Sequence, residues 1–351
     1  MRIIHFLNHT RRSNGHVHVA IDLACAQAKM GHEVAVISAG GDFDPLLARY
    51  GVRHVIIEQR RTPWTLVRAT VALRRAVAEL KPEIIHAHMM TSTLLAIFAR
   101  SAAPFKLITT VHNEFDRGAI IMALGDRVIA VSDSVRDSMA SRGTPRAKLR
   151  VVLNGTIGSP RLSEKQPEAE PLVHPAITFV GGLHPRKGVD DLIEAFKLVA
   201  AAEPSPRLNI VGAGPHKGEY EKLAAQSGYG DRISFFGYQA DPRRFLLGSD
   251  IFVLASHADP APLVLAEARD CGCAIVATEV GGIPEMLDRG KAGILVPPKR
   301  PDRIAEELLK ILRDSSLLKD LRARSRENLA YFTVQRACDE CLAIYREALT
   351  A

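Results

Sequence analysis

The sequence of 351 residues lacks the signatures of several common protein classes. It contains no run of about 18 apolar residues, so a transmembrane helix is not predicted. The opening residues, MRIIHFLNHT, lack the apolar length of a signal peptide, and we expect them to form a strand. Aromatic residues make up only 5% of the chain and no recognised nucleic-acid-binding motif occurs, so we expect no nucleic-acid partner.

Cysteine is also scarce. Five cysteines, an odd number, in a chain of this length predict reduced thiols in the cytoplasm. Cys271 with Cys273, and Cys338 with Cys341, lie close enough in sequence to be considered as metal ligands. Neither pair has further ligands at the spacing of a zinc site, so we expect no metal.

The common nucleotide and hydrolase motifs are missing too. The segment after the first predicted strand, NHTRRSNGH, contains no G-x-G-x-x-G, and GAGPHK at 212–217 has Lys217 in place of the third glycine. No P-loop and no G-x-S-x-G occurs. These absences argue against a nicotinamide-dependent enzyme, a P-loop NTPase and an α/β-hydrolase.

Positive charge is concentrated in the first half of the chain. Residues 1–150 hold 21 lysines and arginines and 12 acidic residues, a net +9, which leaves −2 of the overall +7 for the rest. This half is therefore expected to contact an anionic substrate or surface. Residues 60–75, RRTPWTLVRATVALRR, combine five arginines with the only tryptophan, as in an interfacial amphipathic helix. The alternative is a helix that covers its own sheet and exposes its arginines to solvent.

The chain reads as two similar halves. Short β-branched runs alternate with helical patterns, which predicts a parallel sheet with helices on both faces. Residues 158–175 are rich in proline and charge and lack periodicity, and the alternation then restarts. We expect an N-terminal domain at 1–160, a linker at 161–175, a C-terminal domain at 176–330, and a final helix at 331–351 that crosses back to the first domain. Two such α/β domains would face each other across a cleft.

Two segments of the second half carry candidate site residues. In VGGLHPRKGVDDLIEAF (180–196), a strand, two glycines and a basic loop with Arg186 and Lys187 precede a helix, an arrangement that suits a diphosphate. In DPAPLVLAEARDCGC (259–273), Asp259 precedes a predicted helix and Glu267 lies one turn inside it. Free amide groups at the helix start can bind an anion, and a carboxylate can accept two hydrogen bonds from a cis-diol. Alternatively, both acids are ordinary loop and helix-surface residues.

These segments and several others resemble the glycosyltransferases of family 4, which have the GT-B fold of two Rossmann-like domains. The similarity extends over nearly the whole chain and its segments follow the family order. They are NGHVHVAIDLACAQAKMGHEVAVIS, PEIIHAHMM, LITTVHN, DRVIAVSDSVRD, VVLNG, VGGLHPRKGVDDLIEAF, LNIVGAGP, RISFFGY, SDIFVLASHADPAPLVLAEARDCGCAIVATEVGGIPEML and GILVPP.

The resemblance assigns roles to these residues. Lys187 matches the family lysine that holds the donor diphosphate. The partner arginine of the family falls on Gly182, and we expect Arg186 to supply the missing cation. The family's first glycine-rich loop is reduced to Asn14–Gly15, where Gly15 allows close approach of a phosphate or sugar.

The family's paired acids fall on Asp259 and Glu267. Glu267 is expected to hold the donor ribose, and Asp259, in place of the usual Glu, to contact the donor sugar near its anomeric centre. His112 matches a histidine near the donor sugar. The predicted catalytic residues are His112, Asp259 and Lys187. The predicted donor-binding residues are Gly15, Gly182, Arg186, Lys187, Gly237, Pro262, Leu263, Val264 and Glu267.

Other histidines and acids are not assigned to the site. His16 with His18, and His86 with His88, resemble metal-ligand pairs but are expected to pack, on alternating strand or loop positions. The segment DFD at 42–44 imitates a D-x-D metal motif, but it follows the second predicted strand, the wrong place for such a site.

The resemblance implies a metal-independent, retaining hexosyltransferase without a cofactor. The N-terminal domain would bind a glycan or lipid-linked acceptor, and the C-terminal domain a nucleotide sugar, with UDP favoured over GDP. Cell-surface polysaccharide or lipopolysaccharide biosynthesis is the expected role. The alternatives are a GT-B protein that binds a nucleotide sugar without transfer, and an epimerase. We expect a cytoplasmic protein, with peripheral binding to the inner face of an anionic membrane left open.

Overall fold

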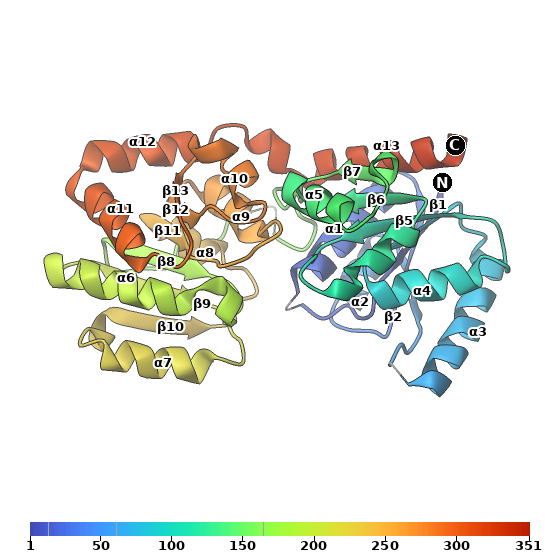
Figure 1. Ribbon diagram of the computed structural model, residues 1–351, viewed down its shortest axis with the longest axis horizontal. Helices are drawn as coiled ribbons and strands as arrows, with labels where there is room; N and C mark the ends of the chain where they lie inside the picture. The colour runs from blue at the N-terminus through green and yellow to red at the C-terminus, as the bar shows by residue number, and fades with distance from the viewer. Residues whose placement is uncertain (13, 61, 164) are drawn as a thin grey trace. The chain divides into compact units, whose positions relative to one another are not determined.

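The computed structural model describes residues 1–12, 14–60, 62–163 and 165–351. The chain forms two compact units (Figure 1). Unit 1 comprises Met1–Arg161 and Tyr331–Ala351, and unit 2 comprises Leu162–Ala330. Each unit is built on one parallel β-sheet with helices packed on it. The predicted α/β class with two Rossmann-like domains is therefore confirmed.

The sheet of unit 1 has seven strands in the order β3-β2-β1-β4-β5-β6-β7, all parallel. The strands are β1 (Arg2–Phe6), β2 (Glu33–Ser38), β3 (Arg53–Ile56), β4 (Ile84–Ala87), β5 (Lys106–Val111), β6 (Arg127–Ala130) and β7 (Leu149–Val151). The α-helices are α1 (Gly15–Lys29), α2 (Asp44–Arg49), α3 (Pro63–Leu80), α4 (Met90–Ala99), α5 (Asp133–Ser141) and α13 (Val334–Thr350). Short 3₁₀ segments lie at η1 (Arg117–Leu124) and η2 (Arg146–Lys148).

Alternating apolar residues give this sheet two buried faces. In β2, Val34 and Val36 belong to a core cluster that includes apolar residues of α1, while Ala35 and Ile37 belong to a cluster that includes apolar residues of α3 and α4. Successive side chains of a strand point to opposite faces, so a continuous apolar run is buried on both sides. This explains why EVAVIS lacks a polar face.

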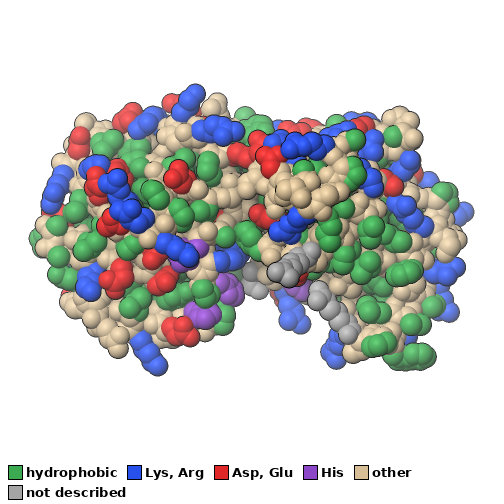
Figure 2. Space-filling model, in the orientation of Figure 1, with side chains coloured by type: hydrophobic (Ala, Val, Ile, Leu, Met, Phe, Trp, Pro, Cys, Tyr) green, Lys and Arg blue, Asp and Glu red, His purple; other side chains and the backbone are tan. Residues whose placement is uncertain are grey.

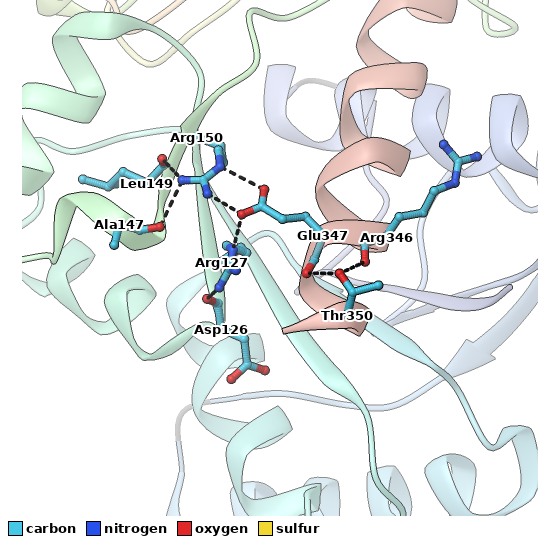
Figure 3. A network of polar contacts seen from close by, with 8 residues as sticks. All are labelled: Asp126, Arg127, Ala147, Leu149, Arg150, Arg346, Glu347 and Thr350. Carbon is cyan, nitrogen blue, oxygen red and sulfur yellow. Dashed lines mark hydrogen bonds and ion pairs between the residues drawn. The ribbon is translucent and has the colours of Figure 1, made fainter.

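The C-terminal helix α13 belongs to unit 1 and packs against α1. Glu347 of α13 accepts hydrogen bonds from Arg127 of β6, at 3.1 Å, and from Arg150 of β7, at 3.0 Å from Nε (Figure 3). At the other end of α13, the side chain of Thr333 caps the helix by accepting from the Arg336 N–H at 3.2 Å. Charged contacts to two strands and a capped start thus hold the end of the chain on the first sheet.

The sheet of unit 2 has six parallel strands in the order β10-β9-β8-β11-β12-β13. The strands are β8 (Ala176–Val180), β9 (Arg207–Val211), β10 (Ile233–Gly237), β11 (Ile251–Leu254), β12 (Ala274–Thr278) and β13 (Ile294–Val296). The α-helices are α6 (Val189–Ala202), α7 (Lys217–Gln226), α8 (Arg243–Leu247), α9 (Leu263–Cys271), α10 (Ile283–Met286), α11 (Pro301–Arg313) and α12 (Ser315–Ser325). The 3₁₀ segments are η3 (Pro185–Lys187), η4 (Gly230–Arg232) and η5 (Asp288–Gly290), and η6 (Leu329–Phe332) contains the point where the chain passes from unit 2 to unit 1.

The strand order reverses once in each sheet. In unit 1 the reversal lies between β1 and β4, and in unit 2 between β8 and β11. Loops leaving the carboxyl ends of two such strands turn in opposite directions, which opens a crevice where ligands of open α/β sheets bind. Ligand binding is therefore expected at the two reversal points. No helix in the described part of the chain has both the length and the apolar character to span a bilayer.

Candidate functional site

In unit 2, the basic loop after β8 is held against the end of β11. Gly188 follows this loop with φ +62°, and a Cβ at this position would lie 2.0 Å from the carbonyl oxygen of Ala255. The His257 N–H donates to the carbonyl of Arg186 at 2.8 Å. Because only glycine permits this approach, the loops that follow two neighbouring strands pack as one surface at the reversal point.

The two cations of the basic loop converge on one carboxylate. Lys187 Nζ lies 2.5 Å from Asp259 Oδ2, and Arg186 Nη1 lies 3.8 Å from Asp259 Oδ1. Lys187 and Asp259 are only 8% and 4% exposed, and Ser256 Oγ donates to Oδ2 at 3.3 Å. Three predicted site residues thus meet, although Lys187 and Asp259 are 72 positions apart in sequence. Sequence reasoning missed that the acid and the lysine form an ion pair.

The backbone of Asp259 is fixed by two glycines after β12. Gly281 has φ +55°, and a Cβ there would lie 1.9 Å from the Asp259 carbonyl oxygen. The Gly282 N–H donates to the same oxygen at 3.0 Å. Asp259 is therefore placed by loops from three neighbouring strands: β8, β11 and β12.

Helix α9 begins next to this cluster. Its first residue is Leu263, and the preceding Pro262 offers no side-chain cap. The N–H groups of Leu263 and Val264 have no acceptor within the helix, so they can bind an anion. Glu267 is half-buried, one turn further along. Its position relative to Lys187 stays a prediction.

Glu267 lies within electrostatic reach of Arg243. The pKa of Arg243 is raised first by its hydrogen bond to Asp241, and the Glu267 carboxylate raises it further. Glu267 thus lies close enough to Arg243 for their charges to interact.

The other predicted glycines lie around the basic loop or at the sheet edge. A Cβ on Gly182 would lie 3.1 Å from Cδ2 of the exposed His184, so a side chain at this position requires a small shift of that ring. Gly237 ends the edge strand β10 with φ +67° and has open space around its Cα. Its carbonyl accepts from the Gly212 N–H at 2.8 Å, which links it to the end of β9. The structure therefore places Gly237 two strands away from the lysine.

In unit 1, the predicted residues lie at the corresponding reversal point and after the strand next to it. Gly15 opens α1, and His112 directly follows β5. The rings of His16 and His112 lie 6.0 Å apart, and His112 Nε2 lies 3.0 Å from Nδ1 of His88. The first loop and the predicted histidine thus share one edge of the sheet.

These imidazoles are neutral. Burial, and to a smaller extent His16, lowers the pKa of His112 to about 3. Burial, and to a smaller extent His9, lowers the pKa of His16 to about 4. At neutral pH both rings carry one N–H and one lone pair, so they can form hydrogen bonds to hydroxyl groups but provide no positive charge.

One histidine pair differs from the sequence expectation and the other agrees with it. His16 and His18 lie in the first turns of α1, not on alternating strand or loop positions, because the helix begins already at Gly15. His86 and His88 lie on β4 and directly after it, both buried. Together with His5 they place one ring nitrogen each within 4.8 Å of one another. All six ring nitrogens of these three residues already have hydrogen-bond partners.

The five cysteines are free and buried. Burial raises the pKa of the thiols of Cys25, Cys273 and Cys338 to about 12, and those of Cys271 and Cys341 higher still. Protonated thiols are poor nucleophiles, so these side chains are unreactive at neutral pH.

Comparisons with known proteins agree with the two-unit architecture. Residues 13–156 match the family described as Glycosyltransferase Family 4, and residues 161–328 match Glycosyl transferases group 1. A D-inositol 3-phosphate glycosyltransferase of Jonesia denitrificans is 26% identical over 94% of this chain and 90% of its own length. The N-acetyl-alpha-D-glucosaminyl L-malate synthase of Bacillus anthracis is 25% identical over 94% of this chain and 93% of its own length.

Solved structures share the fold at low sequence identity. The Anabaena protein HepE in complex with UDP and glucose superposes with a TM-score of 0.84 at 18% identity, over 98% of this chain and 99% of that one. Sucrose-phosphate synthase from Thermosynechococcus elongatus gives a TM-score of 0.82 at 21% identity, over 98% of both chains. Matches to both family descriptions, to glycosyltransferases over nearly their full length and to the GT-B fold identify the chain as a glycosyltransferase of family 4.

Proposed function

We propose that the protein transfers a sugar, with retention of configuration and without a metal ion, from a nucleoside-diphosphate sugar to a glycan or lipid-linked acceptor. UDP is favoured over GDP, and the role would be cell-surface polysaccharide or lipopolysaccharide biosynthesis. The observation that carries the proposal is the cluster at the strand reversal of unit 2, in which the buried Lys187–Asp259 pair lies beside the exposed Arg186. A structural neighbour that contains UDP and glucose supports it.

The cluster suits a leaving diphosphate. Lys187 and Arg186 together carry two positive charges against one on Asp259, and the start of α9 adds the partial positive charge of a helix N-terminus. As the bond between the sugar C1 and the diphosphate breaks, negative charge grows on the phosphate oxygen. Cations and amide groups already in place stabilise that charge without having to reorganise.

The remaining predicted residues would orient the donor. In this proposal Glu267 accepts hydrogen bonds from the ribose, Asp259 contacts the sugar near its anomeric centre, and His112 binds a sugar hydroxyl. The acceptor oxygen attacks C1 on the face that the diphosphate leaves, and the acceptor proton passes to a diphosphate oxygen. No protein nucleophile is required.

The first test is a thermal-shift screen of nucleotide sugars, followed by product analysis with labelled donors. A donor at 100 times its Kd should stabilise the fold by about 2.7 kcal/mol. Product analysis then separates transfer to an acceptor from epimerisation and from binding without reaction. Lys187→Ala and Glu267→Ala should each lower kcat/KM at least about tenfold, since each removes a charged contact to the donor. Near-normal kcat/KM in both variants would reject these assignments.

We also infer that unit 1 docks on an anionic lipid bilayer through α3 and α4. The inward face of α3 buries Leu73 and Val77 against the sheet, as the solvated-helix alternative requires. Its outward face, however, exposes Trp64 (71%) beside two exposed valines, and the neighbouring α4 exposes Phe98 (63%). Figure 2 shows hydrophobic side chains at the surface in this region, with Lys and Arg side chains around them.

The composition of this surface favours a bilayer. Arg68, Arg74 and Arg75 of α3 are exposed, and they lie on the same outward side as Trp64. Arginines attract anionic headgroups, while the tryptophan and the apolar side chains can enter the headgroup region. Vesicle flotation should show binding to vesicles that contain phosphatidylglycerol and little binding to pure phosphatidylcholine. Equal binding to both, or none, would refute docking on an anionic surface.

A further inference from the structure

A row of four hydrogen-bonded side chains crosses the interior of unit 1. Gln27 Oε1 lies 2.9 Å from His5 Nε2, His5 Nδ1 lies 3.0 Å from His88 Nε2, and His88 Nδ1 lies 3.0 Å from His112 Nε2. Gln27 and His5 are fully buried and His88 almost so. The row, named here the imidazole row, leads from the interior of α1 to the carboxyl edge of the sheet.

A branch of the same network continues to the C-terminal helix. Gln27 Nε2 lies 3.3 Å from the hydroxyl of Tyr345, that hydroxyl lies 2.6 Å from His86 Nδ1, and His86 Nε2 lies 2.6 Å from the hydroxyl of Thr110. The network therefore joins α13, α1 and three strands of the sheet. Among the described residues of the network, Gln27 alone is hydrogen-bonded to members of both the row and the branch.

Every imidazole in this network is neutral. Burial lowers the pKa of His5 to about 4 and that of His112 to about 3, and it lowers those of His86 and His88 well below 6.5. A neutral imidazole has one N–H and one lone pair. Each hydrogen bond needs one donor and one acceptor. The orientation of the Gln27 amide, with either its oxygen or its nitrogen facing His5, therefore determines the direction of every bond in the row.

The distances from the Tyr345 hydroxyl to its two partners determine the orientation of the Gln27 amide. Its separation of 3.3 Å from Gln27 exceeds the ~3.0 Å limit of a hydroxyl donor and lies closer to the range of an amide N–H donor. Its separation of 2.6 Å from His86 is typical of a hydroxyl donor. Tyr345 thus receives a hydrogen bond from the Gln27 amide and donates one to His86, which leaves Gln27 Oε1 as the acceptor that faces His5.

The direction of the row follows. His5 donates to Gln27 through Nε2 and accepts through Nδ1, so His88 donates to His5 through Nε2 and accepts through Nδ1. His112 must then donate to His88 through Nε2. Its Nδ1 carries the lone pair, and no side chain or backbone group in the described part of the chain is found bonded to it.

We propose that the imidazole row fixes His112 in the Nε2–H tautomer and so presents its Nδ1 as a hydrogen-bond acceptor for a hydroxyl group of the sugar ligand. Gln27, His5 and His88 are positioning residues: they act on the ligand only through His112. An acceptor nitrogen favours a sugar that carries a hydroxyl at this point and disfavours one that presents a carbonyl or carboxylate oxygen. The identity of the ligand rests on the proposed function, whereas the tautomer does not.

The direct test reads the tautomer without any ligand. The whole protein is labelled with ¹⁵N-histidine, and two-bond ¹H–¹⁵N correlation spectra are recorded at neutral pH. Signals of His112 are assigned by their loss in His112→Asn. We expect a protonated Nε2 and an unprotonated Nδ1. A protonated Nδ1, whether in the other tautomer or in an imidazolium ion, would overturn the proposal even if the protein is an active transferase.

The functional test changes the far end of the row. Gln27→Met removes the acceptor of His5, which frees the row to reverse, so His112 should gain Nδ1–H and kcat should fall by up to about tenfold. Gln27→Glu keeps an acceptor oxygen that faces His5, so the tautomer and most of kcat should be kept at a pH at which the ¹⁵N signals of His5 show a neutral ring. Leu23→Ala, a buried substitution on the same helix, is the control for loss of packing. It should lower Tm but leave the tautomer and kcat unchanged.

The outcomes distinguish a row that positions His112 from a row that only stabilises the fold. If Gln27→Met and Leu23→Ala lower kcat alike and His112 keeps its tautomer in both, the row only stabilises the fold and the proposal fails. If no transferase activity is found, the proposed function fails, but the spectra still decide the tautomer. If Gln27→Met does not fold, the wild-type and Gln27→Glu spectra provide the same decision.

Discussion

Removing either charge of the Lys187–Asp259 pair should destabilise unit 2, but the two substitutions should change nucleotide binding in opposite directions. The two charges are 2.5 Å apart and almost fully buried. Removing one member of such a pair leaves the other buried and uncompensated, which typically costs about 3–5 kcal/mol. Asp259→Asn should cost more than Lys187→Met, because Asp259 keeps Arg186 at 3.8 Å when the lysine is lost. In the described residues, Lys187 has no second carboxylate within ion-pair distance.

Binding of UDP should change with opposite sign in these two variants. In the proposed donor complex, Lys187→Met removes a charge-assisted hydrogen bond to the diphosphate, worth about 1.5–3 kcal/mol, so Kd should rise roughly tenfold to a hundredfold. Asp259→Asn removes a negative charge near the bound diphosphate. At roughly 5 Å this repulsion would be about 0.8 kcal/mol in water and is larger at a buried carboxylate, so Kd should fall at least severalfold. Transfer should nevertheless slow in Asp259→Asn, since the contact to the sugar is weakened.

Isothermal titration with UDP measures both affinities. Hydrogen exchange at the β8 and β11 amides reports the stability of unit 2 separately, which matters because the chain has two units. A double variant, Lys187→Met with Asp259→Asn, should destabilise by less than the sum of the single variants. If UDP bound equally well to Lys187→Met and the wild type, or more weakly to Asp259→Asn, the electrostatic account of the cluster would be wrong.

Three further predictions concern packing and protonation. Gly188→Ala should destabilise unit 2 by at least about 2 kcal/mol and weaken UDP binding, because the new Cβ meets the Ala255 carbonyl at 2.0 Å and φ is +62°. Equal stability of the variant and the wild type in chemical denaturation would contradict this prediction. Arg269→Met should cost about 3 kcal/mol or more, since this fully buried arginine donates to three carbonyls and one carboxylate, and a change within 0.5 kcal/mol would refute it. Unit 1 should lose stability as pH falls from about 6.5 towards 4: its buried histidines stay neutral when folded but take up protons when unfolded, and His5 alone accounts for about 2 kcal/mol at pH 5. Hydrogen exchange measured at pH 7 and pH 5 tests this loss of stability, and equal protection of the β1 amides at both pH values would count against it.

Local sequence patterns predicted where helices and strands occur better than they predicted which of these elements lie next to one another. The β/α alternation follows from apolar periodicity, and the basic loop was recognisable because glycines and cations follow a strand. The ion pair of Lys187 and Asp259 was not predictable in this way. It depends on β8 lying beside β11, and strand order is set by how chain crossovers pack, which no local window of sequence records. The error at His16 and His18 has a local cause: alternation over three residues is compatible with both a strand and the first turn of a helix.

The imidazole row is a second feature that depends on which strands pair and that local sequence patterns do not predict. His5 and His86 are register partners across β1 and β4, the two strands where the order of the first sheet reverses. A histidine in a short apolar strand predicts burial, but its partner is decided by which strand pairs with it and in which register. A shift by one residue would turn His5 to the face covered by α3 and α4, because side chains alternate. The tautomer of His112 would then depend on no residue of α1. Sheet register, rather than the identity of any single histidine, therefore determines what this edge of the sheet can offer a ligand.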